Sequence, residues 1–152
     1  MMEAMTSLSG LEYMRAIASG EAEPPPIARL LGFGVVEVDE GRAVFTADPG
    51  PQHYNPIGVV HGGLAATLLD SAMGCAVHTT LPAGWSYGTL DLSARFVRPI
   101  TSDTGRIVCE GVVVHRGRKT ATTEGRVWAE DSGKLLAHGT GSALLLPVAV
   151  AE

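Results

Sequence analysis

The sequence has few of the features that membrane, secreted and nucleic-acid-binding proteins require. No stretch approaches the ~20 consecutive apolar residues that span a bilayer. The formal net charge of −5 argues against a general role on nucleic acid or on a membrane surface, because both favour basic partners. The N-terminal segment contains Glu3 and lacks a long apolar run, so no signal peptide is expected. These absences predict a cytoplasmic protein that binds neither a membrane nor nucleic acid.

Metal-binding and redox patterns are also missing. The two cysteines, Cys75 and Cys109, lie far apart in apolar surroundings and form no Cys-x-x-Cys pair, so we expect buried thiols. The five histidines show none of the spacings typical of zinc sites, and no glycine-rich phosphate loop is present. We therefore predict that the protein holds no metal and requires no cofactor.

Composition and hydrophobic periodicity predict one main domain with a single long helix. A chain of 152 residues that is 45% hydrophobic is long and apolar enough to bury a core. A capping box at Ser9 and Glu12 predicts a helix that ends at Gly20, and a second short helix begins at Pro26 and ends at Gly32. The period then changes, and the pattern predicts two strands within 33–47, a loop over 48–58, a long helix over 59–80, and strands over 87–97, 105–115, 119–129 and 134–146.

The predicted helix over 59–80 has apolar residues on nearly every side, which is typical of a buried helix. We expect six antiparallel strands to wrap around it in an α+β architecture. We divide the chain into an N-terminal helical extension and linker (1–26), the main domain (27–147) and a C-terminal tail (148–152). In the strand over 87–97, alternation predicts one face with Leu90, Leu92, Ala94 and Phe96 and the other with Thr89, Asp91, Ser93 and Arg95.

One short motif imitates an active site. Residues 84–88 read Gly-Trp-Ser-Tyr-Gly, which matches the Gly-x-Ser-x-Gly nucleophile elbow of α/β-hydrolases. That elbow requires a strand before the serine and a helix after it, whereas this stretch lies between a predicted helix and a predicted strand. Ser86 is therefore not expected to act as a nucleophile.

Asp70 is the unusual residue of the long helix. A carboxylate in an apolar helix is costly unless it is paired or solvated. One interpretation is structural, with Asp70 bonded to a neighbouring segment or placed on a narrow polar stripe. The other is functional, with Asp70 held in a cleft as a general base or a nucleophile.

The sequence His61-Gly62-Gly63 stands at the predicted start of the same helix. The first N–H groups of a helix have no partner within it, and a glycine lets a ligand oxygen approach closely. These N–H groups suit a carbonyl that becomes an oxyanion, although the glycines alternatively serve close helix packing. Gly62 and Asp70 are eight residues apart, or about 12 Å along a helix axis, which is too far for both to act on one carbonyl. If both serve one reaction, two copies of the chain must form a two-fold dimer with two composite sites.

Basic residues gather in the second half of the chain. Seven of the eleven fall between Arg95 and Arg126, and the densest cluster is His-Arg-Gly-Arg-Lys at a predicted turn. The turn is either a solvated surface or a docking site for a phosphorylated group such as that of coenzyme A, because arginine suits phosphate recognition. The candidate contacts are Arg98, Arg116, Arg118 and Lys119.

Three stretches together resemble a known family. "NPIGVVHGGLAATLLDSAMG", "GTLDLSARFVRP" and "HRGRKTA" are similar to the hotdog-fold acyl-CoA thioesterases of the phenylacetate-degradation (PaaI) type. The resemblance covers roughly residues 31–146 and implies the hotdog fold, a long helix wrapped by an antiparallel sheet. It also implies roles in catalysis for Asn55, His61, Gly62, Asp70 and Thr89.

The implied roles follow the family motif position by position. Asn55 orients the thioester carbonyl or the water, His61 is structural or orienting, and the Gly62 N–H donates to the carbonyl. Asp70 acts as general base or nucleophile, and Thr89 helps to hold the water. In the family the asparagine and glycine come from one subunit and the acidic and hydroxyl residues from its partner.

The resemblance implies an acyl-CoA thioesterase that releases a carboxylic acid and free coenzyme A. Coenzyme A is then part of the substrate, with its phosphates near Arg98 and the turn over 116–119. The minimum unit is a homodimer, and relatives imply a homotetramer. Two alternatives stay open: a non-catalytic acyl-CoA-binding module of the same fold, and a hotdog hydratase or dehydratase. The acyl group is open between aryl-acetyl, benzoyl-like and medium-chain, because the N-terminal segment lies outside the core motif and its helix could cover or reshape the acyl pocket.

Overall fold

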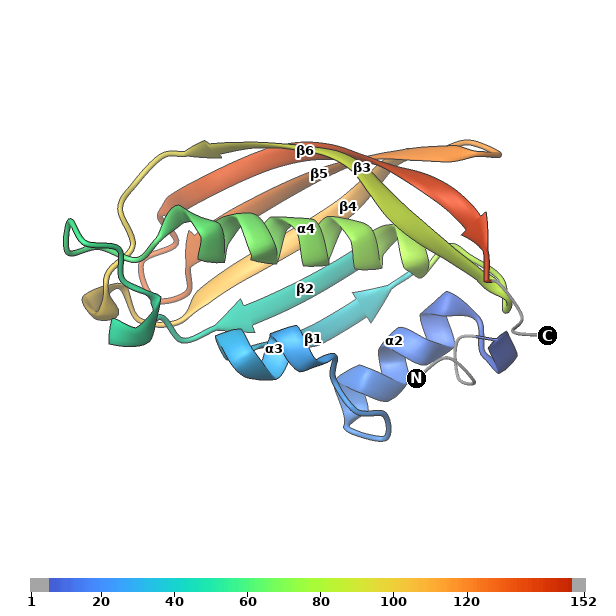
Figure 1. Cartoon of the computed structure of the whole chain (residues 1–152), viewed down its shortest axis with the longest axis horizontal. Helices are drawn as coiled ribbons and strands as arrows, with labels where there is room; N and C mark the ends of the chain where they lie inside the picture. The colour runs from blue at the N-terminus through green and yellow to red at the C-terminus, as the bar shows by residue number, and fades with distance from the viewer. Residues whose placement is uncertain (1–5, 149–152) are drawn as a thin grey trace.

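The computed structural model describes residues 6–148 (Figure 1). Its helices are α2 (Gly10–Ser19), α3 (Pro26–Leu31) and α4 (Gly62–His78), with short 3-10 turns at Pro51–His53 and Ser102–Thr104. Its strands are β1 (Phe33–Asp39), β2 (Arg42–Ala47), β3 (Trp85–Phe96), β4 (Ile107–Arg116), β5 (Thr120–Ala129) and β6 (Leu135–Pro147). The predicted order of elements is confirmed. Most of the predicted C-terminal tail, from residue 149 on, lies outside the described residues, as do residues 1–5.

A single antiparallel sheet of six strands curves around α4, in the order β1-β2-β4-β5-β6-β3 (Figure 1). This confirms the α+β architecture and the hotdog fold that the resemblance implies. Contact between helix and sheet is close because two strands carry glycine where α4 crosses. A Cβ at Gly111 of β4 would lie 2.3 Å from the Ala72 backbone, and one at Gly125 of β5 would lie 2.9 Å from Leu69. The largest buried side chains on the sheet side of α4 include Leu68 and Leu69.

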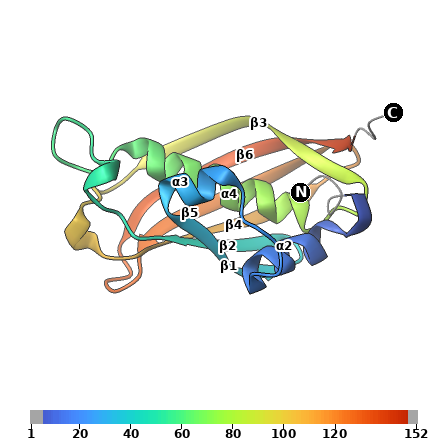
Figure 2. The same ribbon diagram turned by 60° about the horizontal axis from the view of Figure 1, so that its bottom comes forward.

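The two N-terminal helices begin and end where the sequence predicts. Ser9 and Glu12 form the capping box of α2, and Gly20 ends the helix with a left-handed φ of 82°. Gly32 ends α3 in the same way, with φ 69°. Helix α2 packs against β1 and against the C-terminal end of α4, while α3 packs against β1 (Figure 2). The N-terminal extension is therefore part of the packed structure.

Helix α4 is shorter than the predicted 59–80. Val60 stays outside it in an isolated antiparallel bridge with Tyr54, and the Val60 N–H donates to the carbonyl of Ile100, 2.8 Å away on a distant loop. His61 instead caps the helix, and its Nδ1 accepts from the Gly63 N–H at 2.8 Å. At the other end, the Thr79 hydroxyl donates to the carbonyl of Ala76, which helps to end the helix at His78.

The prediction that α4 is apolar and covered on nearly every side is wrong for one stripe. Asp70 is exposed, and Gly63, Ala66, Thr67 and Ser71 are only partly buried. These residues recur at helical spacing, so they share one side of α4. The sheet covers the opposite side, and this stripe is left open in the single chain.

Strand β3 also differs from its predicted pattern. A bulge interrupts its pairing with β6 between Thr89 and Asp91, so Leu90 has no partner and is 56% exposed. One extra residue reverses the inward and outward alternation of a strand. Leu92 and Ala94 pack against the core, whereas Leu90 and Phe96, which were predicted on the same face, are exposed. On the other side of the bulge, Thr89 and not its neighbour faces α4.

Candidate active site

The N-terminal end of α4 presents an unpaired backbone donor. The N–H of Gly63 is satisfied by the His61 side chain, and the N–H of Leu64 donates to the His61 carbonyl at 3.0 Å. The Gly62 N–H donates to no group among residues 6–148. A donor at the positive end of a helix dipole is placed to bind a carbonyl oxygen or an anion. The predicted position of Gly62 in the first turn is thus confirmed.

Asn55 and Arg98 share a surface cavity of about 460 Å³ with Gly62. The Asn55 Oδ1 accepts from the N–H groups of Ile57 and Val59, which holds the side chain in place. Its Nδ2 donates to no group among the described residues and is available to a ligand. Arg98 is exposed, and one of its guanidinium nitrogens donates to the carbonyl of Leu135 at 2.7 Å.

Asp70 lies two turns further along α4, beside β3. Its Oδ1 accepts from the Thr89 hydroxyl at 2.8 Å, so the structure brings these two predicted residues together. No other group in residues 6–148 bonds to the carboxylate, which leaves Oδ2 free. The axial rise from Gly62 to Asp70 is about 12 Å, so one chain carries two separate half-sites on the same helix. Ser142 and Asp91 form a neighbouring pair at 2.5 Å, where β6 meets β3 beyond the bulge.

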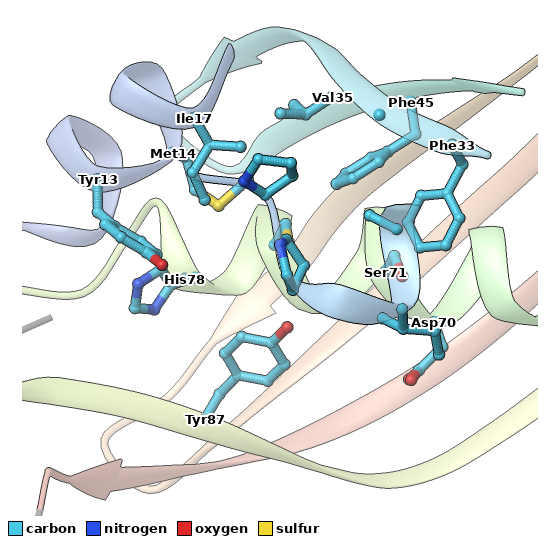
Figure 3. Close-up of a pocket in the computed structure, with 16 residues that line it drawn as sticks. Tyr13, Met14, Ile17, Phe33, Val35, Phe45, Asp70, Ser71, His78 and Tyr87 are labelled. Carbon is cyan, nitrogen blue, oxygen red and sulfur yellow. The ribbon is translucent and has the colours of Figure 1, made fainter. Parts of the chain in front are cut away.

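A cavity of about 290 Å³ extends from Asp70 under α2 and α3 (Figure 3). Asp70 and Ser71 stand at one end, and Tyr13, His78 and Tyr87 stand at the other. Apolar side chains from α2, α3, β1 and β2 line the space between them: Met14, Ile17, Ile27, Ala28, Phe33, Val35 and Phe45. The cavity is suited to an apolar group attached to an atom held at Asp70.

Helix α2 is fixed over this cavity by its first residue. The Gly10 N–H donates to the carbonyl of Leu81 at 2.9 Å. A Cβ on Gly10 would lie 1.7 Å from the carbonyl oxygen of His78, so only glycine allows this approach. Tyr13, His78 and Tyr87 were not predicted as site residues. The available signal was their chemistry: they are polar aromatic residues within otherwise apolar segments.

Burial sets the protonation of the groups around the inner end of the cavity. It lowers the pKa of His78, so the imidazole is neutral at physiological pH. Burial also raises the pKa of the Cys75 thiol to about 12, so Cys75 is not a thiolate nucleophile. The Tyr87 hydroxyl is hydrogen-bonded to that thiol, and burial raises the pKa of Tyr87 well above its ordinary value.

The four candidate coenzyme A contacts are not brought together in one chain. Arg98 lies at the N-terminal end of α4, near Gly62. Arg116, Arg118 and Lys119 belong to the β4–β5 hairpin, whose first β5 residues pack with Val77 at the C-terminal end of α4. The cationic residues therefore divide into two groups at opposite ends of the helix.

Other chemistries find little support in the described residues. Ser86 lies within β3 and is followed by more strand, which is unlike a nucleophile elbow. Within residues 6–148, no three His, Cys, Asp or Glu side chains are grouped to hold a metal ion. No helix in that range is long and apolar enough to cross a membrane.

Comparison with known proteins gives consistent matches. A family model described as the thioesterase superfamily matches residues 57–136, which include Gly62, Asp70 and Thr89 but neither α2 nor α3. Human acyl-coenzyme A thioesterase 13 is 27% identical over 136 residues, which cover 89% of this chain and 94% of that protein. A putative esterase of Halobacterium salinarum is 38% identical over 69 residues, only 44% of the length of each. A solved variant of the phenylacetic acid degradation protein PaaI from Thermus thermophilus is 31% identical with TM-score 0.71, covering 79% of this chain and 98% of that one.

Proposed function

Because the chain belongs to the thioesterase superfamily, we propose that it hydrolyses acyl-CoA thioesters to a carboxylic acid and free coenzyme A. The observation that carries the proposal is that α4 presents two different reactive groups at separate positions. An unpaired N–H at Gly62 suits the thioester carbonyl, and a carboxylate at Asp70, held by Thr89, suits the activation of water. The similarity to an acyl-coenzyme A thioesterase supports coenzyme A as the carrier of the acyl group.

The reaction needs both half-sites at one carbonyl, and we infer that two copies of the chain supply them. Antiparallel packing of two α4 helices would set Gly62 of one copy against the partner subunit's Asp70. The open stripe of α4 supports this, since it contains Asp70 and is lined by small residues. Strand β3 supports it too, because it is an edge strand of twelve residues. Its residues Leu90 and Phe96 are 56% and 59% exposed, and Val97, which follows the strand, is 45% exposed. A long apolar edge of this kind is a template for pairing with another strand.

In this composite site, the Gly62 N–H stabilises the negative charge that develops on the carbonyl oxygen. Asn55 orients the carbonyl or the water with its free amide, and His61 fixes the helix start by capping Gly63. Asp70 either removes a proton from the attacking water or attacks the carbonyl carbon to form an anhydride that water then opens. In both cases the carbon–sulfur bond breaks, the water's oxygen ends in an acid, and the sulfur leaves as coenzyme A. No metal or cofactor takes part in either route.

The same dimer would bring together the two groups of cationic residues that lie at opposite ends of α4. When the helices run antiparallel, the N-terminal end of one lies toward the C-terminal end of the other. Arg98 of one copy and the partner subunit's Arg116, Arg118 and Lys119 would then stand on the same side of one site, where they suit the phosphates of coenzyme A. The homotetramer and the cytoplasmic location implied by the resemblance stay predictions.

Mixing two inactive variants tests the composite site. Asp70→Asn removes the carboxylate, and Gly62→Pro removes the N–H at a helix position that tolerates proline. Co-refolded in equal amounts, half of the dimers are mixed, and each mixed dimer contains one intact site. Activity should therefore return to about a quarter of the wild-type value. A mixture as inactive as its components, with mixed dimers shown by mass spectrometry, would contradict the shared site.

A further inference from the structure

The inner end of the acyl cavity contains polar groups that the proposed hydrolysis does not use. Asp70 and His78 both project from α4 at opposite ends of the cavity (Figure 3). Eight residues of helix separate them, or about 12 Å. The walls between them are apolar, so the inner end differs from these walls in being polar.

His78 is 4% exposed, and neither of its ring nitrogens has a hydrogen-bond partner in the described structure. The other buried histidine provides a contrast. His53 is 8% exposed, and its Nδ1 accepts from the Gly50 N–H at 3.1 Å while its Nε2 lies 2.9 Å from the Leu31 carbonyl. Buried polar groups are normally paired, so the orphaned nitrogens of His78 require an explanation.

Tyr13 of α2 meets His78 edge-on, with ring centroids 5.9 Å apart and planes at 89°. Its hydroxyl bonds to no group among residues 6–148. Tyr87 stands on the other side of His78 at the same centroid distance, but its hydroxyl is engaged by the Cys75 thiol. The unengaged polar groups at the inner end of the cavity are therefore those of His78 and Tyr13 (Figure 3).

We propose that His78 and Tyr13 form a specificity site for an acyl group that carries a hydrogen-bonding oxygen at its far end. The proposal rests on the hydrolytic function above, since it places the acyl chain in the cavity with its carbonyl at Asp70. A cavity of about 290 Å³ lies at the lower limit of small-molecule sites, which suits a compact chain. The oxygen at its end would pair with the imidazole and the phenol, which the folded chain otherwise leaves unsatisfied. Tyr13 is brought to the site by α2, outside the matched family segment.

The test compares two thioesters that differ by one oxygen, octanoyl-CoA and 8-hydroxyoctanoyl-CoA. The wild-type protein should show a kcat/KM for the hydroxylated substrate about five- to tenfold higher, as one net hydrogen bond predicts. Hexanoyl and decanoyl pairs of the same design locate the chain length at which the preference is largest. Equal rates, or a preference for the plain chain at every length, would overturn the proposal.

Tyr13→Phe removes one oxygen and keeps the ring, so it is the principal variant, and His78→Phe is the second. Each should reduce the preference, by lowering kcat/KM for the hydroxylated substrate more than kcat/KM for octanoyl-CoA. Tyr87→Phe is the matched control: it makes the same change in the same cavity at a hydroxyl that is already paired, and the preference should survive it. Equal losses with both substrates, or a loss in Tyr87→Phe as large as in Tyr13→Phe, would contradict the assignment.

Binding to the Asp70→Asn variant separates this inference from the proposed function. That variant should bind both thioesters without consuming them, and calorimetry should show the same five- to tenfold preference. A wild-type protein that hydrolyses neither thioester, although Asp70→Asn discriminates between them, would refute the hydrolase and leave the specificity site standing. Hydrolysis of both thioesters, with no difference between them in binding or in rate, would support the hydrolase and refute the specificity site.

Discussion

The N-terminal end of α4 and the cavity under α2 are built in different ways. The helix end is open to solvent and uses backbone groups of neighbouring residues, with His61 capping Gly63 and leaving the Gly62 N–H free. The cavity is lined by side chains from α2, α3, α4 and three strands. The family match includes the first region and stops before α2 and α3. In the proposed function, the chemistry depends on groups that a short local motif supplies, and substrate choice depends on how distant elements assemble.

The largest effect should come from the carboxylate. Asp70→Asn keeps the shape of the side chain and its contact with Thr89 but cannot accept a proton or attack a carbonyl. We expect kcat to fall by about 10²–10⁴ with every acyl group, because the loss concerns the reaction centre. Thiol release from an acyl-CoA panel measures it, with circular dichroism as the control for folding. Full activity in a folded Asp70→Asn protein would remove Asp70 from the mechanism.

The next effect concerns the backbone donor. Gly62→Pro should lower kcat by about 10²–10³, the usual effect of losing an oxyanion donor. Gly62→Ala is its control, since it keeps the N–H and adds a Cβ that would meet the exposed Phe96 ring at 3.1 Å. We expect the alanine variant to retain much more activity than the proline variant. If both variants lose the same activity, the loss comes from the added side-chain atoms and not from the missing N–H.

Thr89→Val removes the hydrogen bond to Asp70 with little change in shape. A bond to a charged group of this kind supports an effect of about tenfold on kcat. Thr89→Ser retains the hydroxyl and should restore most of the rate. A valine variant with unchanged kcat would assign Thr89 a purely structural role.

The cavity should respond differently, in selectivity alone. Ile17→Ala enlarges the cavity from the α2 side, so the acyl chain of highest kcat/KM should lengthen. The shift in preference between neighbouring chain lengths should be about tenfold, typical of a methylene in an apolar pocket. The kcat for the best substrate, measured by stopped flow at saturating concentration, should stay nearly unchanged. An equal loss of activity with all chain lengths would contradict the assignment of substrate choice to the cavity.

The smallest effect belongs to the β4–β5 hairpin, which touches neither region. Replacing Arg116 and Arg118 by Gln should raise KM for acyl-CoA by about three- to tenfold, as expected for exposed ion pairs. Acyl-N-acetylcysteamine lacks the nucleotide, and its KM should not change. Equal effects on both substrates would count against phosphate docking at the hairpin.

Local features of the sequence predicted the fold well. The capping box at Ser9, the helix stop at Gly20 and the His61-Gly62-Gly63 start of α4 each depend on neighbouring residues, and each is present. The predicted start of α4 was wrong because Val60 is held in a β-bridge with Tyr54, and its N–H donates to Ile100, forty residues further on. Periodicity contains no information about such a contact.

Part of the candidate site could also be predicted from local features. The His-Gly-Gly start and Asp70 are visible as a motif, and their spacing predicts two half-sites. The cavity was not visible, because Tyr13 and His78 meet only when α2 docks at the end of α4. The glycine that permits this docking, Gly10, looks unremarkable in sequence, and its meaning appears only beside the His78 carbonyl.

The bulge at Leu90 has a consequence for insertions and deletions. Leu90 pairs with nothing and is largely exposed, so many side chains should be accepted there. Removing the residue altogether would leave β3 in strict alternation with Thr89 and Leu92 still on the inner face, because Thr89 pairs with Ala143 and Asp91 with the adjacent Ser142. The position should therefore accept a deletion as well as a substitution, and a gap placed there in an alignment would mark a chain whose carboxylate keeps its hydroxyl partner.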